Sequence, residues 1–154
     1  MQKVIFICLG NICRSPMAEA VFQQMVNESG LADQFDIDSA GTAAYHVGEP
    51  AHRGTLAILQ SHNVSYNGRS RQVADEDFWE DETYIVAMDK SNVDRLYRRF
   101  GDHPRVFRLL DFAQNTNEEN VPDPYYHDNF PYVYELVQDG CAGLLAEIKK
   151  ENGW

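Results

Sequence analysis

A cysteine and an arginine lie close together near the start of the chain. The segment that holds them reads Cys8, Leu9, Gly10, Asn11, Ile12, Cys13, Arg14 and Ser15. Five residues between Cys8 and Arg14 are enough to curl around a tetrahedral anion and to aim successive backbone N–H groups at it. The planar guanidinium of Arg14 can bind two phosphate oxygens at once. The same positive potential favours the thiolate form of Cys8, so the segment predicts a phosphate-binding loop with a cysteine nucleophile.

Two polar side chains of this segment have predicted roles inside the loop. Asn11 tolerates left-handed backbone geometry and can bond the neighbouring backbone, which predicts a loop-stabilising residue. The hydroxyl of Ser15 can donate a hydrogen bond to the Cys8 sulfur, although Ser15 also fits the N-cap of a helix. The alternative is that Cys8 is a small buried residue at a strand end and that Arg14 is a solvated residue at a helix start.

The elements on either side of the loop follow from hydrophobic spacing. Residues 4–9 form an uninterrupted apolar run that predicts a strand buried on both faces. After it, apolar residues recur at helical spacing from Ala18 to Val26, with Ser15 as the predicted N-cap and Pro16 as the first helical residue. The loop is therefore expected to join a strand to a helix N-terminus, whose positive dipole end favours a bound anion.

The rest of the chain alternates strands with helices. We expect strands over residues 35–39, 84–88 and 106–110, and helices over residues 55–62, 92–100 and 133–149, with Ser91 before the second of these helices and Cys141 buried in the third. This alternation predicts one domain over residues 1–154, an α/β fold whose doubly wound four-stranded parallel sheet has helices on both faces. Ligands of such sheets bind beyond the carboxyl ends of the strands. Residues 113–128 lack regular apolar spacing and are expected to form a functional loop.

Charge and cysteine content exclude several classes of function. The formal net charge is −11, so we expect binding neither to nucleic acid nor to anionic membranes, and any charge that attracts phosphate must be local. Three cysteines in 154 residues argue against a disulfide framework and for reduced thiols. The apolar run before Gly10 is too short for a signal peptide or a membrane span, so a cytoplasmic protein is expected.

Several segments of the chain resemble those of one protein family in the same order. The opening VIFICLGNICRSPMAEAVF is followed by DSAGTAAYHVGEP, SRQV, MDKSN and VPDPYYHD. Together they resemble the low-molecular-weight protein tyrosine phosphatases over nearly the whole chain. The resemblance implies a four-stranded parallel sheet, catalytic roles for Cys8 and Arg14, and a general acid at Asp123, the aspartate of the Asp-Pro-Tyr segment.

The chemistry of phosphotyrosine hydrolysis also requires an acid. The phenol leaving group has a pKa near 10, so its departure is slow unless a carboxylic acid protonates the bridging oxygen. Asp123 is the only aspartate followed by proline, and Pro124 biases it toward an extended backbone at a loop edge. Taken without its context, Asp123 would be an ordinary solvated loop acid.

The resemblance implies two further features. Tyr45 and Tyr125 would form the walls of a deep cleft that accepts a phenyl ring and leaves a phosphoserine too short to reach the thiolate. Cys13 would protect Cys8 through a reversible disulfide, which the short spacing of the two cysteines allows in a curled loop. One departure is visible, because Gly68 stands where many members of the family carry a histidine. The support that this histidine gives the loop is therefore in question here.

Two other classes of protein are compatible with a cysteine in a phosphate-binding loop. A thiol-relay arsenate reductase shares this loop but needs two further cysteines close together downstream, and only Cys141 is available. A phosphate-binding module or phosphocarrier would not need Asp123. The five histidines have no metal-ligand spacing, so we expect no metal and no cofactor. The expected partners are phosphotyrosine-containing proteins or peptides, with inorganic phosphate as product, and the expected state is a monomer or weak dimer.

Overall fold

Four parallel strands form a single sheet in the order β2-β1-β3-β4. The strands are β1 (Gln2–Cys8), β2 (Phe35–Gly41), β3 (Tyr84–Ala87) and β4 (Val106–Arg108). The structure is a computed structural model that describes the backbone of residues 1–154 and the side chains of residues 1–125 and 128–154. The central strand β1 pairs on both edges, so its carboxyl end lies in the middle of the sheet.

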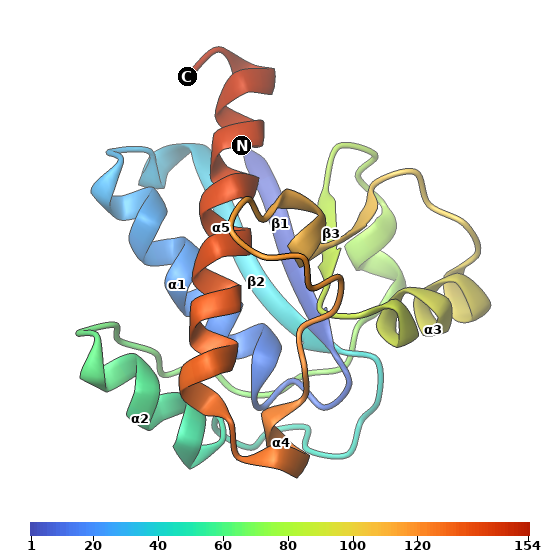
Figure 1. The fold of residues 1–154 in the computed structure, drawn as a ribbon. Helices are drawn as coiled ribbons and strands as arrows, with labels where there is room; N and C mark the ends of the chain where they lie inside the picture. Colours follow the sequence, from blue (N-terminus) through green and yellow to red (C-terminus); the bar gives the residue numbers. More distant parts are fainter.

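Alternate side chains of β1 build the two layers on either side of the sheet. Val4, Phe6 and Cys8 face a core that includes buried residues of α1 (Arg14–Glu28) and α5 (Phe130–Asn152). Ile5 and Ile7 face the opposite core. The second core includes Leu96 of α3 (Lys90–Phe100), whereas α2 (Arg53–Ser61) contacts α1 and α5 on the first side (Figure 1). The predicted doubly wound four-stranded parallel sheet is confirmed.

Several predicted boundaries were wrong because side-chain caps and short 3-10 turns decide them. Helix α3 begins at Lys90 instead of residue 92, since Asp89 instead of Ser91 caps it. Strand β4 ends at Arg108, and the expected continuation to residue 110 is the 3-10 helix η3 (Leu109–Phe112). Two other 3-10 helices are η1 (Ala32–Gln34) and η2 (Asp75–Phe78). These corrections leave the order of the elements unchanged.

The start of α1 is the correction that matters most for chemistry. The helix begins at Arg14, and the N-cap residue is Cys13, which makes no side-chain cap hydrogen bond. The prediction of Ser15 as N-cap was therefore wrong. Its hydroxyl contacts Cys8 and Asn11 instead. Of the two possible roles of Ser15, helix cap or partner of the Cys8 sulfur, the folded protein therefore uses the second.

The long segment before α5 crosses the carboxyl end of the sheet. Its anchor is Val121, whose N–H bonds the Met88 carbonyl just after β3 at 2.9 Å. The one-turn helix α4 (Pro124–His127) follows, with Asp123 as its N-cap, and α5 begins at Phe130. Among the described residues, none of the helices combines the length and the apolar character needed to cross a bilayer.

Candidate active site

The loop between β1 and α1 is tied to the chain that follows β2. The N–H groups of Thr42 and Ala43 bond the carbonyls of Cys8 and Leu9 at 2.9 and 3.0 Å, and the N–H of His52 bonds the Ile12 carbonyl at 2.7 Å. Gly41 pairs with Cys8 in the sheet register, and a Cβ atom on Gly41 would come within 2.8 Å of the Leu9 carbonyl oxygen. This close approach requires glycine and fixes the outer side of the loop.

Asn11 holds the loop from inside. Its φ of 56° is the left-handed conformation that the sequence predicts. Its Oδ1 accepts the N–H of Arg71 at 3.0 Å, and its Nδ2 donates to the hydroxyls of Ser15 at 2.7 Å and Ser39 at 3.0 Å. The side chain is 2% exposed, so these bonds replace water for a buried amide. Because Arg71 fixes Oδ1, the orientation of the amide is determined.

Ser15 is oriented toward the sulfur of Cys8. The two atoms Cys8 Sγ and Ser15 Oγ are 3.1 Å apart. Since the Asn11 amide already donates to Ser15 Oγ, the hydrogen of the hydroxyl is available for the sulfur. The hydroxyl of Ser15 is therefore positioned to donate a hydrogen bond to the Cys8 sulfur.

Arg14 is buried and held by one edge of its guanidinium. Nη1 donates to Asp89 Oδ2 at 2.6 Å and to the Val121 carbonyl at 2.9 Å, and the residue is 3% exposed. Burial lowers the pKa of Arg14, but negative charge at Cys8, the hydrogen bond to Asp89 and the nearby Asp123 outweigh that effect and raise the pKa above its ordinary value. The guanidinium is thus a fixed cation beside Cys8.

Asp123 comes to the same place from far along the chain. Its Oδ2 lies 3.4 Å from Arg14 Nη2, although 109 residues separate the two in sequence. Its Oδ1 accepts the N–H of Tyr125 at 3.0 Å and caps α4. The structure therefore brings Cys8, Arg14 and Asp123 together, with one carboxylate oxygen of Asp123 used for the cap and the other beside the arginine.

The predicted aromatic walls are both exposed, Tyr45 at 70% and Tyr125 at 50%. The Tyr125 ring lies 6.0 Å from the ring of His46 and 5.9 Å from that of His52. His46 belongs to the same turn as Tyr45, so this turn and the segment that holds Asp123 and Tyr125 lie side by side. The spacing of His46 and His52 in the sequence bears on them only as metal ligands and does not predict their position beside the loop.

The other two cysteines differ from Cys8 in their surroundings. Burial, together with the negative charges of Cys8 and Asp123, raises the pKa of the Cys13 thiol to about 12, and Thr55 Oγ1 donates to the Cys13 carbonyl at 3.1 Å. Cys141 is fully buried on α5, as predicted, and burial raises its pKa. All three cysteines are free thiols in this structure.

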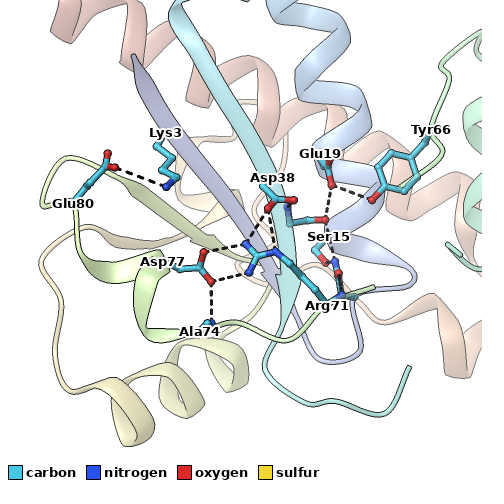
Figure 2. A network of polar contacts seen from close by, with 11 residues as sticks. Lys3, Ser15, Glu19, Asp38, Tyr66, Arg71, Ala74, Asp77 and Glu80 are labelled. Carbon is cyan, nitrogen blue, oxygen red and sulfur yellow. Dashed lines mark hydrogen bonds and ion pairs between the residues drawn. The ribbon is translucent and has the colours of Figure 1, made fainter. Parts of the chain in front are cut away.

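Several polar residues around the loop were not singled out from the sequence. Asp89 holds Arg14, and Ser70 Oγ donates to the Gly10 carbonyl at 3.0 Å. Arg71 makes two bonds to Asp77 and one to Asp38, which fixes the backbone that bonds Asn11 (Figure 2). Only Asp89 carried a local signal, because the pair Asp89 and Asn92 has the spacing of a capping box. Within the described part of the chain, no three His, Cys, Asp or Glu side chains are grouped to hold a metal ion.

Comparisons with known proteins agree with this geometry. A family model described as low molecular weight phosphotyrosine protein phosphatase matches residues 3–153. A relative from Bacillus subtilis, the low molecular weight protein-tyrosine-phosphatase YfkJ, is 44% identical over 155 residues, which cover 99% of this chain and 99% of the relative. The crystal structure of YfkJ matches with a TM-score of 0.92 over 98% of this chain and 96% of that chain. A protein tyrosine phosphatase from Entamoeba histolytica, solved with Hepes in the active site, is 36% identical with a TM-score of 0.88 and 99% of each chain covered.

Proposed function

The chain belongs to the low molecular weight phosphotyrosine protein phosphatase family and is a protein tyrosine phosphatase, and from this we propose that Cys8, Arg14 and Asp123 carry out the hydrolysis. The observation that supports these roles most strongly is the position of Arg14. Its guanidinium lies 3.4 Å from Asp123 Oδ2, and its raised pKa has negative charge at Cys8 as a cause. Nucleophile, cation and acid therefore share one small volume.

The phosphoryl group binds in the loop of residues 8–14. The contacts of Arg14 with Asp89 and Val121 both use Nη1, so we assign the binding of two phosphate oxygens to Nε and to Nη2, which lies 3.4 Å from Asp123 Oδ2. Backbone N–H groups of the loop, from Leu9 to Cys13, and the N-terminus of α1 bind the remaining charge. These groups stabilise the charge on the equatorial oxygens in the transition state.

Two displacements at phosphorus complete the reaction. In the first, the Cys8 thiolate forms a sulfur–phosphorus bond while the bond to the phenolic oxygen breaks, and Asp123 transfers its proton to that oxygen. In the second, Asp123 takes a proton from water, whose oxygen attacks phosphorus. The sulfur–phosphorus bond breaks, inorganic phosphate leaves, and Cys8 returns as a thiolate. Ser15 stabilises the thiolate at both ends of the cycle.

The substrate is proposed to be a phosphotyrosine side chain, with small aryl phosphates as surrogates. Tyr45 and Tyr125 provide exposed aromatic surface, and the ring of Tyr125 lies 6.0 Å from the ring of His46 and 5.9 Å from that of His52. A phenyl ring packs well against such surfaces. The proposal also covers action on phosphotyrosine-containing proteins in the cytoplasm, by one domain over residues 1–154 that is a monomer or a weak dimer.

Mutation of the nucleophile tests the proposal directly. Release of phosphate from an aryl phosphate is measured without added metal for wild type, Cys8→Ser and Arg14→Lys. We expect no turnover by Cys8→Ser, which still binds vanadate, and a large loss in Arg14→Lys, because an ammonium cannot reproduce the two contacts of the fork. Turnover by Cys8→Ser at the wild-type rate would rule out the mechanism. Arsenate with thiol donors serves as the second substrate pair, and its reduction would favour the arsenate reductase alternative.

A further inference from the structure

The space beside Gly68 is filled by the side chain of Tyr66. A Cβ atom placed on Gly68 would lie 2.6 Å from Tyr66 Cζ and closer still to the hydroxyl oxygen. The absence of a side chain at position 68 therefore allows the phenol of Tyr66 to reach inward. Tyr66 is half-buried, and its hydroxyl donates to Glu19 Oε1 at 3.0 Å (Figure 2).

Glu19 receives a second donor at the same oxygen. Ser39 Oγ donates to Glu19 Oε1 at 2.6 Å. A carboxylate that accepts two hydroxyl donors is favoured in its ionised form. Burial raises the pKa of Glu19, and the bonds from Ser39 and Tyr66 act against that shift. The charges that face Glu19 are those of Asp38, which raises its pKa further, and Arg71, which lowers it.

A series of hydrogen bonds, each with a defined donor and acceptor, joins Glu19 to the loop between β1 and α1. Ser39 donates to Glu19 and accepts from Asn11 Nδ2, which also donates to Ser15 Oγ. Arg71 fixes the orientation of this amide through Asn11 Oδ1. Every donor in the series is thus committed, and the last one, the hydroxyl of Ser15, is directed at the Cys8 sulfur. Loss of the acceptor at Glu19 would free the Ser39 hydroxyl to turn away, which removes one of the three hydrogen bonds of the Asn11 side chain.

We propose that Tyr66 is a positioning residue. Its hydroxyl lies where a side chain at position 68 would be. It holds the Glu19 carboxylate as the hydrogen-bond acceptor that orients Ser39 and, through Ser39, Asn11 and Ser15 toward Cys8. The inference rests on the proposed function of Cys8 as thiolate nucleophile. It assigns the support of the catalytic loop to a hydroxyl from outside the loop, through a series of four hydrogen-bonded side chains.

The test removes one oxygen atom. Tyr66→Phe is compared with wild type in the pH dependence of Cys8 alkylation by iodoacetate, followed by the mass of the peptide that carries Cys8, and in the pH dependence of kcat/KM on an aryl phosphate. We expect the alkylation midpoint to rise by about 0.5 to 1 pH unit and kcat/KM at pH 6 to fall about three- to tenfold. Tyr132→Phe is the matched control, because the Tyr132 hydroxyl also donates to a glutamate, Glu118 Oε1, at 3.1 Å on the exposed surface.

Two further variants separate positioning from general destabilisation. Gly68→Ala adds the Cβ atom that would displace the phenol of Tyr66, so it shifts the alkylation midpoint in the same direction as Tyr66→Phe. Ser39→Ala interrupts the series, so in that background Tyr66→Phe has no additional effect on the midpoint. The inference would be overturned if the shifts in alkylation midpoint caused by Ser39→Ala and Tyr66→Phe were additive. A Tyr66→Phe midpoint equal to that of Tyr132→Phe would overturn it as well. If wild type turns over and Cys8→Ser does not, such a result leaves the proposed role of Cys8 as nucleophile standing. Turnover by Cys8→Ser at the wild-type rate would overturn that role itself.

Discussion

Asp89 Oδ2 lies 2.6 Å from Arg14 Nη1, closer than the 3.4 Å between Asp123 Oδ2 and Arg14 Nη2. The other oxygen of the same carboxylate accepts the N–H of Asn92 at 2.8 Å and caps α3. One side chain therefore anchors the guanidinium that we propose to bind phosphate and also caps the start of α3. Because each oxygen has its own partner, mutation can separate the two contributions.

Asparagine and alanine at position 89 should have different consequences. Asparagine is as good an N-cap as aspartate, so Asp89→Asn should keep the capping contribution to the free energy of unfolding but lose the ionic contact with Arg14, with kcat/KM lower by about tenfold or more. Asp89→Ala should lose the same activity and also about 1 kcal/mol of unfolding free energy. Steady-state kinetics and urea unfolding measure the two effects. Wild-type kinetics in Asp89→Asn would show that Arg14 needs no anchor at this position.

The acid role of Asp123 predicts a dependence on the leaving group. Asp123→Asn keeps an oxygen for the N–H of Tyr125, so α4 should remain capped. Hydrolysis of phosphotyrosine should slow by about 10²- to 10⁴-fold, whereas aryl phosphates with acidic phenols should lose much less because they need little protonation. A series of substituted phenyl phosphates measures the difference. Equal losses along the series would assign the proton to another group.

Glu19 should cost stability at neutral pH. Burial is the main cause that raises its pKa in the folded state, so the folded protein holds this proton more tightly than the unfolded chain does. The stability that this tightly held proton of Glu19 contributes is fully present below the pKa that Glu19 has in the unfolded chain. It is lost as pH rises through the pKa that Glu19 has in the folded protein. Relative to wild type, Glu19→Gln should therefore gain unfolding free energy between pH 4 and pH 7. Urea unfolding of both proteins at the two pH values tests this, and a difference independent of pH would contradict it.

Peroxide treatment should reveal whether Cys13 protects the nucleophile. Peroxide converts the Cys8 thiolate to a sulfenic acid, and the Cys13 sulfur can then attack that sulfur and expel water to form a disulfide. Negative charge at Cys8 is one cause of the raised pKa of Cys13, and this cause disappears when Cys8 is oxidised. Wild type should regain activity with a thiol reductant more completely than Cys13→Ser. Equal recovery, without a cross-linked peptide in the mass spectrum, would leave Cys13 as a packing residue only.

The arrangement of strands and helices was predictable because each buried element carries its own pattern. The apolar run of β1 and the inward stripe of α5 identify a two-sided parallel sheet and its covering helix without any long-range information. Cap positions were less predictable, since a residue such as Ser15 has two possible partners. The choice depends on the distance to the Cys8 sulfur, which only the folded loop defines.

The site was predictable in part. Cys8 and Arg14 belong to one short segment, and Asp123 was placed by resemblance. The anchor Asp89 lies 75 residues from Arg14, and with 24 acidic residues in the chain no local pattern selects it as the partner of a buried arginine. The contact of Tyr66 with Glu19 spans 47 residues and depends on the absence of a side chain at Gly68. Such contacts follow from tertiary packing and leave no periodic signal in the sequence.

The distance along the sequence between Arg14 and the two groups that bind its Nη1 has a consequence during protein synthesis. The Val121 carbonyl that binds this guanidinium is 107 residues further along the chain. At the rates at which ribosomes elongate chains, that length takes about 5 to 20 seconds. Throughout this interval Cys8 and Arg14 have both been made, but the guanidinium lacks at least one of the two groups that bind its Nη1, since Asp89 is made before Val121. The nascent polypeptide therefore carries an incomplete nucleophile site, and catalytic competence begins only after the segment between β4 and α5 has emerged and docked.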